Sequence, residues 1–380
     1  MVKFLVVALV FVSVVVNGQE PVTFLSTDSI TSRCYLTGDW DQLIKTANLA
    51  FGQKIDYKKL RQRIGYAYFV KGDYYRAQIN YEKALGFDET DVDTHAYLYY
   101  CGINTGNEAY ARIHAKMLPM DLQKKLSEKR YKPVDAIDLE YNYKANDLLS
   151  RSNPTYIRMG INSQLGYRLT FYQSVSNYKQ TLDSEITRQP EYFALLNWSL
   201  SSRSMLNFAY HFLNTSVSGF KYPGNLFYSS YSTKINRITL GINGSILNSS
   251  NQNTTQLGIT AGITLPGKQR IYLKSFLNEV IGQDNKHIVF TQNAGLRLAN
   301  SLWAEGNITL GNLKNCNDHN ALYIYNSIDP SLFRTGLTIF WYTGIRIILF
   351  GNSTYEKKET DLTNYRYKQQ SFSGGIIWKL

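Results

Sequence analysis

The chain has 380 residues, a formal net charge of +12 and a mean hydropathy of -0.29. That hydropathy excludes a bundle of membrane-spanning helices, but it allows a membrane β-barrel, whose strands are apolar on one face only. The basic residues are dispersed along the sequence, which argues against a nucleic-acid-binding domain.

Residues 1–18 have the layout of a secretory signal peptide. Lys3 precedes an apolar run from Phe4 to Val16, and Asn17 and Gly18 follow it. The run is about 13 residues long, which is too short to span a bilayer as a helix. We therefore predict cleavage after Gly18 and export of the mature chain.

Residues 19–120 are predicted to form a helical repeat domain. A glycine followed by Asp or Asn recurs at Gly38, Gly72 and Gly106, 34 residues apart, and that is the period of the tetratricopeptide repeat. A simple bundle of helical hairpins is the alternative. Repeat arrays present surfaces to other proteins, so this domain predicts a protein partner. The middle copy carries the repeat signature best, at Gly65, Tyr68, Gly72, Ala77, Tyr81 and Ala84.

Residues 121–134 are rich in lysine and arginine. Two interpretations fit this segment: a solvated linker, or a basic collar that lies against anionic lipid head groups. We favour the linker.

Residues 135–380 alternate between apolar and polar side chains, as strands with two different faces do. In the closing segment, alternate residues form one apolar face. We interpret this face as a barrel C-terminal signal, and its main residues are Phe372, Ile376, Trp378 and Leu380. Signals of this kind usually end in an aromatic residue, and here Trp378 stands two positions before the last one. The segment 137–143 is expected to be the first strand and to run outward from the periplasm.

The spacing of turn residues predicts about 14 strands, with 12 or 16 as alternatives, since bacterial barrels have even strand numbers. Tight turns are expected near 165–166, 201–204, 234–237, 266–269, 300–301 and 342–344. Longer polar loops are expected near 146–154, 178–188, 216–225, 248–254, 282–286, 312–331 and 356–370. This alternation of short and long connections favours an antiparallel outer-membrane barrel over residues 135–380, rather than a soluble β-sandwich.

A signal peptide, a helical repeat domain and a C-terminal barrel together resemble the YaiO-type outer-membrane proteins of Bacteroidetes-like Gram-negative bacteria. The segments that carry the resemblance are 165–172, 325–330 and 374–380. The resemblance implies an outer-membrane location with a periplasmic N-terminal domain. It implies no settled activity, so no catalytic residue is carried over.

Charged residues on the polar parity are candidate lumen charges, which set solute selectivity in a pore or pair across the lumen and close it. They are Glu140, Lys144, Arg168, Lys274, Arg297, Glu305 and Arg346. The histidines and cysteines match no metal or redox spacing, and a bond between Cys34 and Cys101 is left open. We predict no catalytic, cofactor or metal site.

Three functions compete at this stage. The first is a scaffold, in which the barrel anchors a repeat domain that recruits a periplasmic protein for envelope assembly, export or polysaccharide handling. The second is a channel or transporter with the repeats as a gate or delivery platform. The third is a lipid- or sugar-acting enzyme that uses His211. Outer-membrane lipids are the other expected partner, and the oligomeric state is open.

Overall fold

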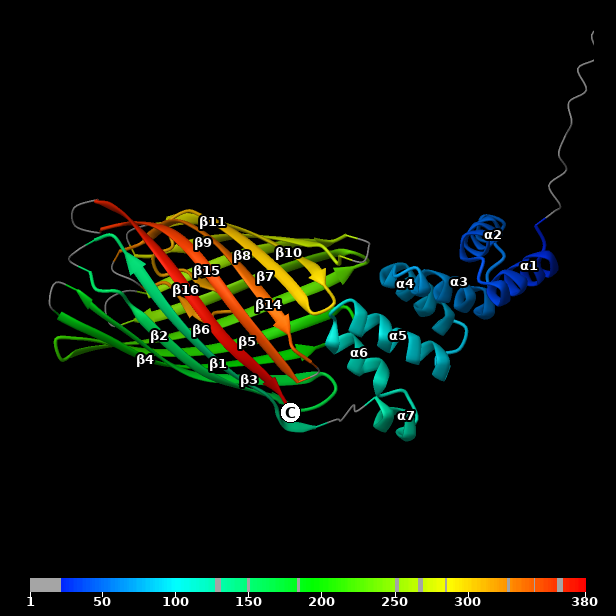
Figure 1. Cartoon of the computed structure of the whole chain (residues 1–380), viewed down its shortest axis with the longest axis horizontal. Helices are drawn as coiled ribbons and strands as arrows, with labels where there is room; N and C mark the ends of the chain where they lie inside the picture. The colour runs from blue at the N-terminus through cyan, green and yellow to red at the C-terminus, as the bar shows by residue number, and fades with distance from the viewer. Residues whose placement is uncertain are drawn as a thin grey trace, which may run out of the picture.

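The computed structural model describes residues 22–126, 131–148, 151–182, 185–249, 253–265, 269–283, 286–326, 329–344, 346–360 and 365–380. The predicted signal peptide lies outside these ranges. A helical domain stands beyond one end of a closed barrel, with its first two helices furthest away (Figure 1). None of the described helices is long and apolar enough to cross a membrane.

Six of the described helices form three successive hairpins, and a seventh short helix leads toward the barrel. The helices are α1 (Phe24–Thr37), α2 (Trp40–Gly52), α3 (Lys58–Val70), α4 (Tyr74–Leu85), α5 (Val92–Asn104), α6 (Glu108–Ala115) and α7 (Met120–Lys125).

The three dipeptides of glycine and Asp or Asn, which recur every 34 residues, form the turns of these hairpins. Gly38, Gly72 and Gly106 adopt φ values of 76°, 76° and 69°, in the left-handed region that ends helices and favours glycine. The next residue caps the second helix: Asp39, for example, accepts a hydrogen bond from the Gln42 amide at 3.1 Å. One dipeptide thus ends one helix and starts the next.

Small residues let the helices of a hairpin approach closely. A Cβ on Gly65 would lie 3.1 Å from the Tyr81 ring, and one on Gly102 would lie 2.8 Å from the Ala111 amide. Cys34 and Cys101 are buried in separate apolar clusters and are free thiols, as is Cys316 in the barrel. The disulfide between Cys34 and Cys101 that the sequence left open is absent.

The remaining described chain forms a closed antiparallel barrel in which β1 pairs with β16. Its 14 strands confirm the predicted fold class and number. They are β1 (Lys132–Asn146), β2 (Thr155–Gln164), β3 (Leu169–Leu182), β4 (Glu185–Ser199), β5 (Ser204–Val217), β6 (Phe220–Ile235), β7 (Ile238–Ser249), β8 (Asn253–Thr264), β9 (Tyr272–Ile281), β10 (Lys286–Ala299), β11 (Leu302–Leu310), β14 (Ser331–Tyr342), β15 (Ile347–Glu359) and β16 (Arg366–Lys379). Two short strands, β12 (Asn317–Asp318) and β13 (Tyr323–Ile324), pair only with each other.

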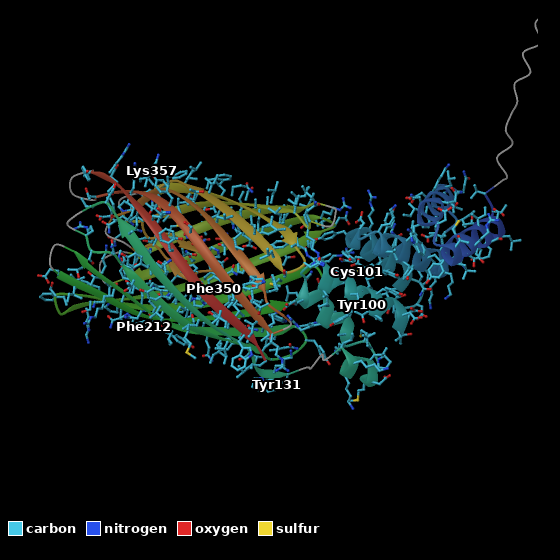
Figure 2. The ribbon with its side chains drawn as sticks, in the orientation of Figure 1. Tyr100, Cys101, Tyr131, Phe212, Phe350 and Lys357 are labelled. Atoms are coloured by element: carbon cyan, nitrogen blue, oxygen red, sulfur yellow. The ribbon has the colours of Figure 1, made fainter. Side chains whose placement is uncertain are left out.

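The outer wall of the barrel is apolar. Ile242 and Ile259 are 61% and 58% exposed, and the C-terminal residues Phe372, Trp378 and Leu380 also face outward at 48–50%. Figure 2 shows the side chains that cover this wall and the helices. A closed sheet leaves no unpaired edge, and an exposed apolar belt around it is stable only in lipid. The chain is therefore an outer-membrane barrel, with its helical domain on the periplasmic side.

Two inward-facing glycines accept an aromatic ring from the neighbouring strand. A Cβ on Gly295 would lie 2.2 Å from the Tyr272 ring, and one on Gly375 would lie 2.4 Å from the Phe350 ring. Each ring fills the space that its glycine leaves on the lumen face, which fixes the register of the two strands.

Two of the predicted long loops are strands instead. The pairing of β3 with β4 continues to Leu182 and Glu185, and the pairing of β5 with β6 continues to Val217 and Phe220. These strand ends are polar on both faces, since water replaces lipid there, so their composition resembles that of a loop. The connections between β11 and β14 and between β15 and β16 remain longer, as expected.

Candidate functional site

The connection between β11 and β14 folds back into the barrel. We call residues 311–326 the inward loop. Its tip is a β12–β13 hairpin in which His319, Asn320 and Ala321 all have positive φ, at 53°, 56° and 68°. Three successive non-glycine residues in this region are strained, and such a turn persists only when its surroundings hold it. Here His211 Nδ1 lies 2.8 Å from the Ala321 carbonyl, and Tyr228 donates to Asn320 at 3.0 Å.

One side of the inward loop is fixed to the wall formed by β4 to β8. The Asn317 amide donates to Ser245 at 2.7 Å and to Gln256 at 3.1 Å, and Gln256 also donates to the Asn317 carbonyl at 3.2 Å. Ala321 is fully buried in an apolar cluster with Phe193 and inward-facing leucines of β5, β6 and β7. Hydrogen bonds and apolar burial therefore hold the loop inside the lumen.

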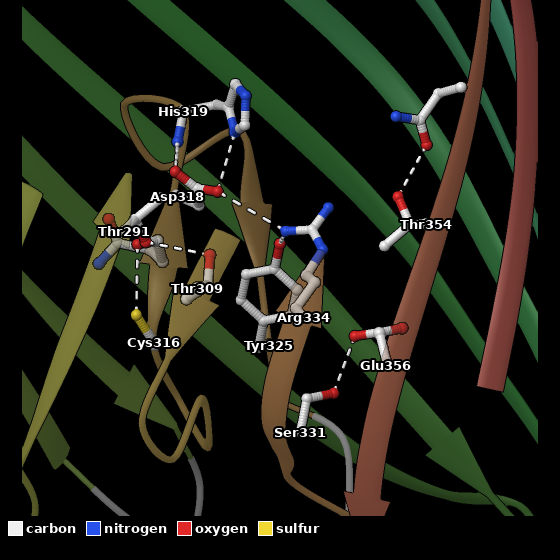
Figure 3. A network of polar contacts seen from close by, with 12 residues as sticks. Thr291, Thr309, Cys316, Asp318, His319, Tyr325, Ser331, Arg334, Thr354 and Glu356 are labelled. Carbon is white, nitrogen blue, oxygen red and sulfur yellow. Dashed lines mark hydrogen bonds and ion pairs between the residues drawn. The ribbon is translucent and has the colours of Figure 1, made fainter. Parts of the chain in front are cut away.

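The other side of the inward loop reaches charged residues across the lumen. Tyr323 donates to Glu140 at 2.8 Å, and Glu140 lies 2.8 Å from Arg158. Arg334 contacts Tyr325 and lies 3.7 Å from Asp318 (Figure 3). These contacts pair Glu140 with its neighbour on β2 and connect the inward loop to β1 and β14.

A cavity of about 840 Å³ lies in the lumen beside the inward loop, lined mainly by β14 to β16 and β1 to β5, with further residues from β6, β7 and β11. Along β15 it reaches from Lys358 to Phe350, eight residues apart, which is about 26 Å at the rise of a strand. Five carboxylates and four Lys or Arg side chains line it, so its charge is nearly balanced.

The structure separates the seven candidate lumen charges into two groups. Four lie on the lumen face of the wall: Glu140, Lys144, Lys274 and Glu305. The other three lie at the periplasmic rim, where Arg168 donates to the Leu200 carbonyl at 3.2 Å and Arg297 donates to Asn300 at 2.9 Å. Arg346 precedes the first residue of β15 at the same rim.

His211 is 1% exposed and holds the inward loop in place. Its Nε2 lies 3.4 Å from Glu191, which also accepts a hydrogen bond from Ser176 at 2.8 Å. Because Ser176 donates to the carboxylate and His211 contacts a backbone carbonyl, this group contains no serine nucleophile paired with a histidine base. Among the described residues, no cluster of three or more His, Cys, Asp or Glu could hold a metal ion.

The helical domain contacts the periplasmic rim through charges of opposite sign. Arg203 in the β4–β5 turn pairs with Glu82 of α4, and this hydrogen bond raises the pKa of Arg203. Arg237 in the β6–β7 turn places one nitrogen 3.1 Å and 3.2 Å from the two carboxylate oxygens of Asp73. We call these two pairs the rim latch.

Further contacts extend around the mouth. Lys234 donates to Tyr75 at 3.2 Å, and Arg270 donates to Asn104 at 2.9 Å. Lys379, the last residue of β16, lies 3.4 Å from Glu108. Because these contacts involve four turns or strand ends, helices α4 to α6 lie across the mouth (Figure 1).

The repeat signature residues build the domain rather than a site. Ala77, Tyr81 and Ala84 are buried, Gly65 lies against Tyr81, and Tyr68 packs on the core. Sequence reasoning missed both the inward loop and the rim latch. The Gly-Asp turn at Gly72 places Asp73 within reach of Arg237 at the rim. From the sequence alone, however, an aspartate at this position predicts only a helix cap.

No protein-family model matches the chain, and no curated protein matches its sequence. Solved outer-membrane barrels are similar to it. The CymD monoaromatic hydrocarbon channel has a TM-score of 0.46 and 8% identity over 72% of this chain and 91% of its own. The Pseudomonas putida toluene transporter TodX has a TM-score of 0.43 and 7% identity over 66% of this chain and 91% of its own. A Pseudomonas aeruginosa FadL homologue has a TM-score of 0.41 with the same identity and coverage. At these values the similarity is one of barrel fold alone.

Proposed function

We propose that this chain is an outer-membrane channel with two closures, the inward loop in its lumen and the helical domain over its periplasmic mouth. The cavity beside the inward loop is the observation that carries this proposal. It follows the wall for most of the strand length and is lined by polar and charged side chains together with aromatic and aliphatic ones, whereas a purely structural barrel would fill that space.

The two closures differ in strength. The inward loop is buried and makes hydrogen bonds to β5, β6 and β7 and to Gln256 of β8, so it moves only when a connected set of contacts breaks. The rim latch is partly exposed, with Arg203 57% and Arg237 25% accessible. We infer that the helical domain opens first and that the loop limits the size of the solute.

Swelling of liposomes in isosmotic solute tests this function. The full chain is compared with a variant in which a short Gly-Ser turn replaces residues 312–328, and heat-modifiable gel mobility verifies that both barrels are folded. We expect slow swelling with the full chain and at least tenfold faster swelling with the shortened loop. Equal rates at the level of empty liposomes would refute the channel.

A scaffold is the second candidate, and an aromatic row in the helical domain favours it. Tyr35, Trp40, Tyr66 and Tyr97 make successive ring contacts at 5.2–6.0 Å, and Tyr35 is 38% exposed. We propose that the three hairpins are tetratricopeptide-type units, that the chain is YaiO-type, and that this row contacts a periplasmic protein. Photocrosslinking from position 35 would count against the scaffold if it captured no more protein than a label on the outer barrel wall.

A further inference from the structure

A row of neutral polar side chains crosses four strands on the lumen wall beside the cavity. Thr338, Asn352, Ser373 and Asn142 stand opposite one another in the registers of β14, β15, β16 and β1. We call these four residues the amide row. All four line the cavity, and hydrogen bonds connect them: Asn352 donates to Thr338 at 2.8 Å, and Asn142 donates to Ser373 at 3.1 Å.

Two acceptors at this wall have no partner. The side-chain oxygen of Asn142, at one end of the amide row, is buried without a hydrogen bond to any described residue. The same holds for Asn307 on β11, which also lines the cavity. A buried acceptor without a donor is unfavourable, so a ligand hydroxyl that donates to it gains binding free energy. The wall therefore favours a ligand with several hydroxyl groups.

Aromatic rings flank the amide row on two sides. Phe340 and Phe350, with ring centroids 6.0 Å apart, lie on the same wall toward the periplasm. Tyr156 stands opposite Asn142 on β2, and Tyr178 stands opposite Tyr156 on β3. Both pairs line the cavity. Ring faces of this kind suit the apolar C–H face of a sugar ring, while its hydroxyls reach the amides.

Several of the charged side chains around the cavity already have partners among the described residues. Glu140 pairs with Arg158, and Glu356 accepts from Ser331 and Gln369, each at 2.8 Å. An ionic ligand would have to displace these partners, and a hydrocarbon would leave the amide oxygens unpaired. The balance of neutral donors, acceptors and rings selects a neutral ligand with many hydroxyls.

We propose that the amide row and its flanking rings bind a neutral saccharide. This inference rests on the proposed function in one respect, because it takes the saccharide to be the solute that passes along the cavity. The binding itself is a property of the wall, and it can be measured whether or not the lumen conducts.

Titration calorimetry of the full chain tests the site. The protein is held in micelles of an amine-oxide detergent, which has no sugar head group, and the probes are maltotriose and trigalacturonate. We expect maltotriose to bind with a Kd of about 1 mM or tighter and trigalacturonate to bind at least tenfold more weakly. No heat with maltotriose, or equal affinity for both probes, would overturn the proposal.

Variants locate the site on the wall. Asn142→Leu and Asn307→Ala, each alone, are expected to weaken maltotriose binding at least tenfold. Asn278→Leu is the matched control, because Asn278 is a buried lumen-facing amide with an unpartnered oxygen but does not line the cavity. Gel mobility verifies folding of each barrel. Equal weakening by Asn278→Leu would refute the assignment.

The swelling assay separates the two proposals. Swelling by the loop-shortened variant without maltotriose binding to the full chain would keep the channel and overturn the saccharide site. Maltotriose binding without swelling would keep the site and overturn the channel.

Discussion

Reversing the rim latch should release the helical domain from the periplasmic mouth. The double variant Arg203→Glu, Arg237→Glu replaces two attractive contacts, to Glu82 and Asp73, by like-charge contacts. The partly exposed Arg203 pair is worth about 0.2–1 kcal/mol, and the more buried contact of Arg237 with both oxygens of Asp73 is worth about 1.5–3 kcal/mol. Their loss sums to about 2–4 kcal/mol.

That loss corresponds to a shift of about 30-fold to 1,000-fold in the equilibrium between docked and undocked domain, at 1.4 kcal/mol for each factor of ten. Spin labels on Gln53→Cys, directly after α2, and on Ser301→Cys at the rim report the separation by double electron–electron resonance. The native cysteines are buried and should not react. We expect one narrow distance in the native background and a broad, longer distribution in the double variant.

Two comparisons make the result specific to the latch. Arg168→Glu, Arg297→Glu changes the rim charge by the same amount at arginines that donate to oxygens of the barrel turns and not to the helical domain, and it should leave the distance narrow. Adding Glu82→Arg restores an opposite-charge pair with Arg203→Glu and should shift the distribution back toward the docked distance, while Asp73 is left unchanged because it caps α4. An unchanged narrow distance in Arg203→Glu, Arg237→Glu would refute the reasoning.

Three further predictions concern stability and assembly. Burial, followed by the charge of nearby His95, lowers the pKa of His114 to about 3 from 6.5, so the unfolded chain binds more protons between these values and the helical domain loses stability as pH falls through them. The loss should reach about 2 kcal/mol at pH 5, seen in urea unfolding monitored on the helices, and His114→Gln should flatten this dependence. Gly295→Val places a side chain against the Tyr272 ring and should destabilise the barrel by about 1–3 kcal/mol; addition of Tyr272→Ala should relieve most of that, and no change in the unfolding midpoint would contradict the close approach. Deletion of residues 19–134 should leave a barrel that still inserts, because its strands close on themselves; failure to reach the outer membrane would contradict the predicted division into residues 1–18, 19–120, 121–134 and 135–380.

The barrel could be predicted because strand alternation is a local property. The parity assigned to the closing segment, Phe372 to Leu380, depends only on neighbours within one strand, and its apolar face is the one that faces lipid. The turns at Gly38, Gly72 and Gly106 were equally local, since one dipeptide both ends and starts a helix. These signals were sufficient for the fold class and the strand number.

The closures could not be predicted because they depend on long-range contacts. The composition of residues 312–331 is that of a polar loop whether it lies in water or in the lumen, and only the partners on β5 to β8 decide between them. The alternation of side chains placed Arg168, Arg297 and Arg346 on the polar face. It could not show that these arginines lie at the rim and not inside the lumen. That position along the barrel axis depends on where each strand ends, and the residue at which a strand ends is set by contacts with its neighbours and not by its own alternation.

Single-channel conductance in a planar bilayer tests the two-closure account most directly. Three proteins are compared: the full chain, the variant with residues 312–328 replaced, and that variant with Arg203→Glu, Arg237→Glu added. The account predicts small or rare openings for the full chain and larger current steps for the variant with the loop replaced. High salt weakens the charge pairs of the rim latch, so it should increase the openings of that variant. The third protein already lacks the latch, and its openings should not change with salt. Identical conductance in all three folded proteins would contradict it.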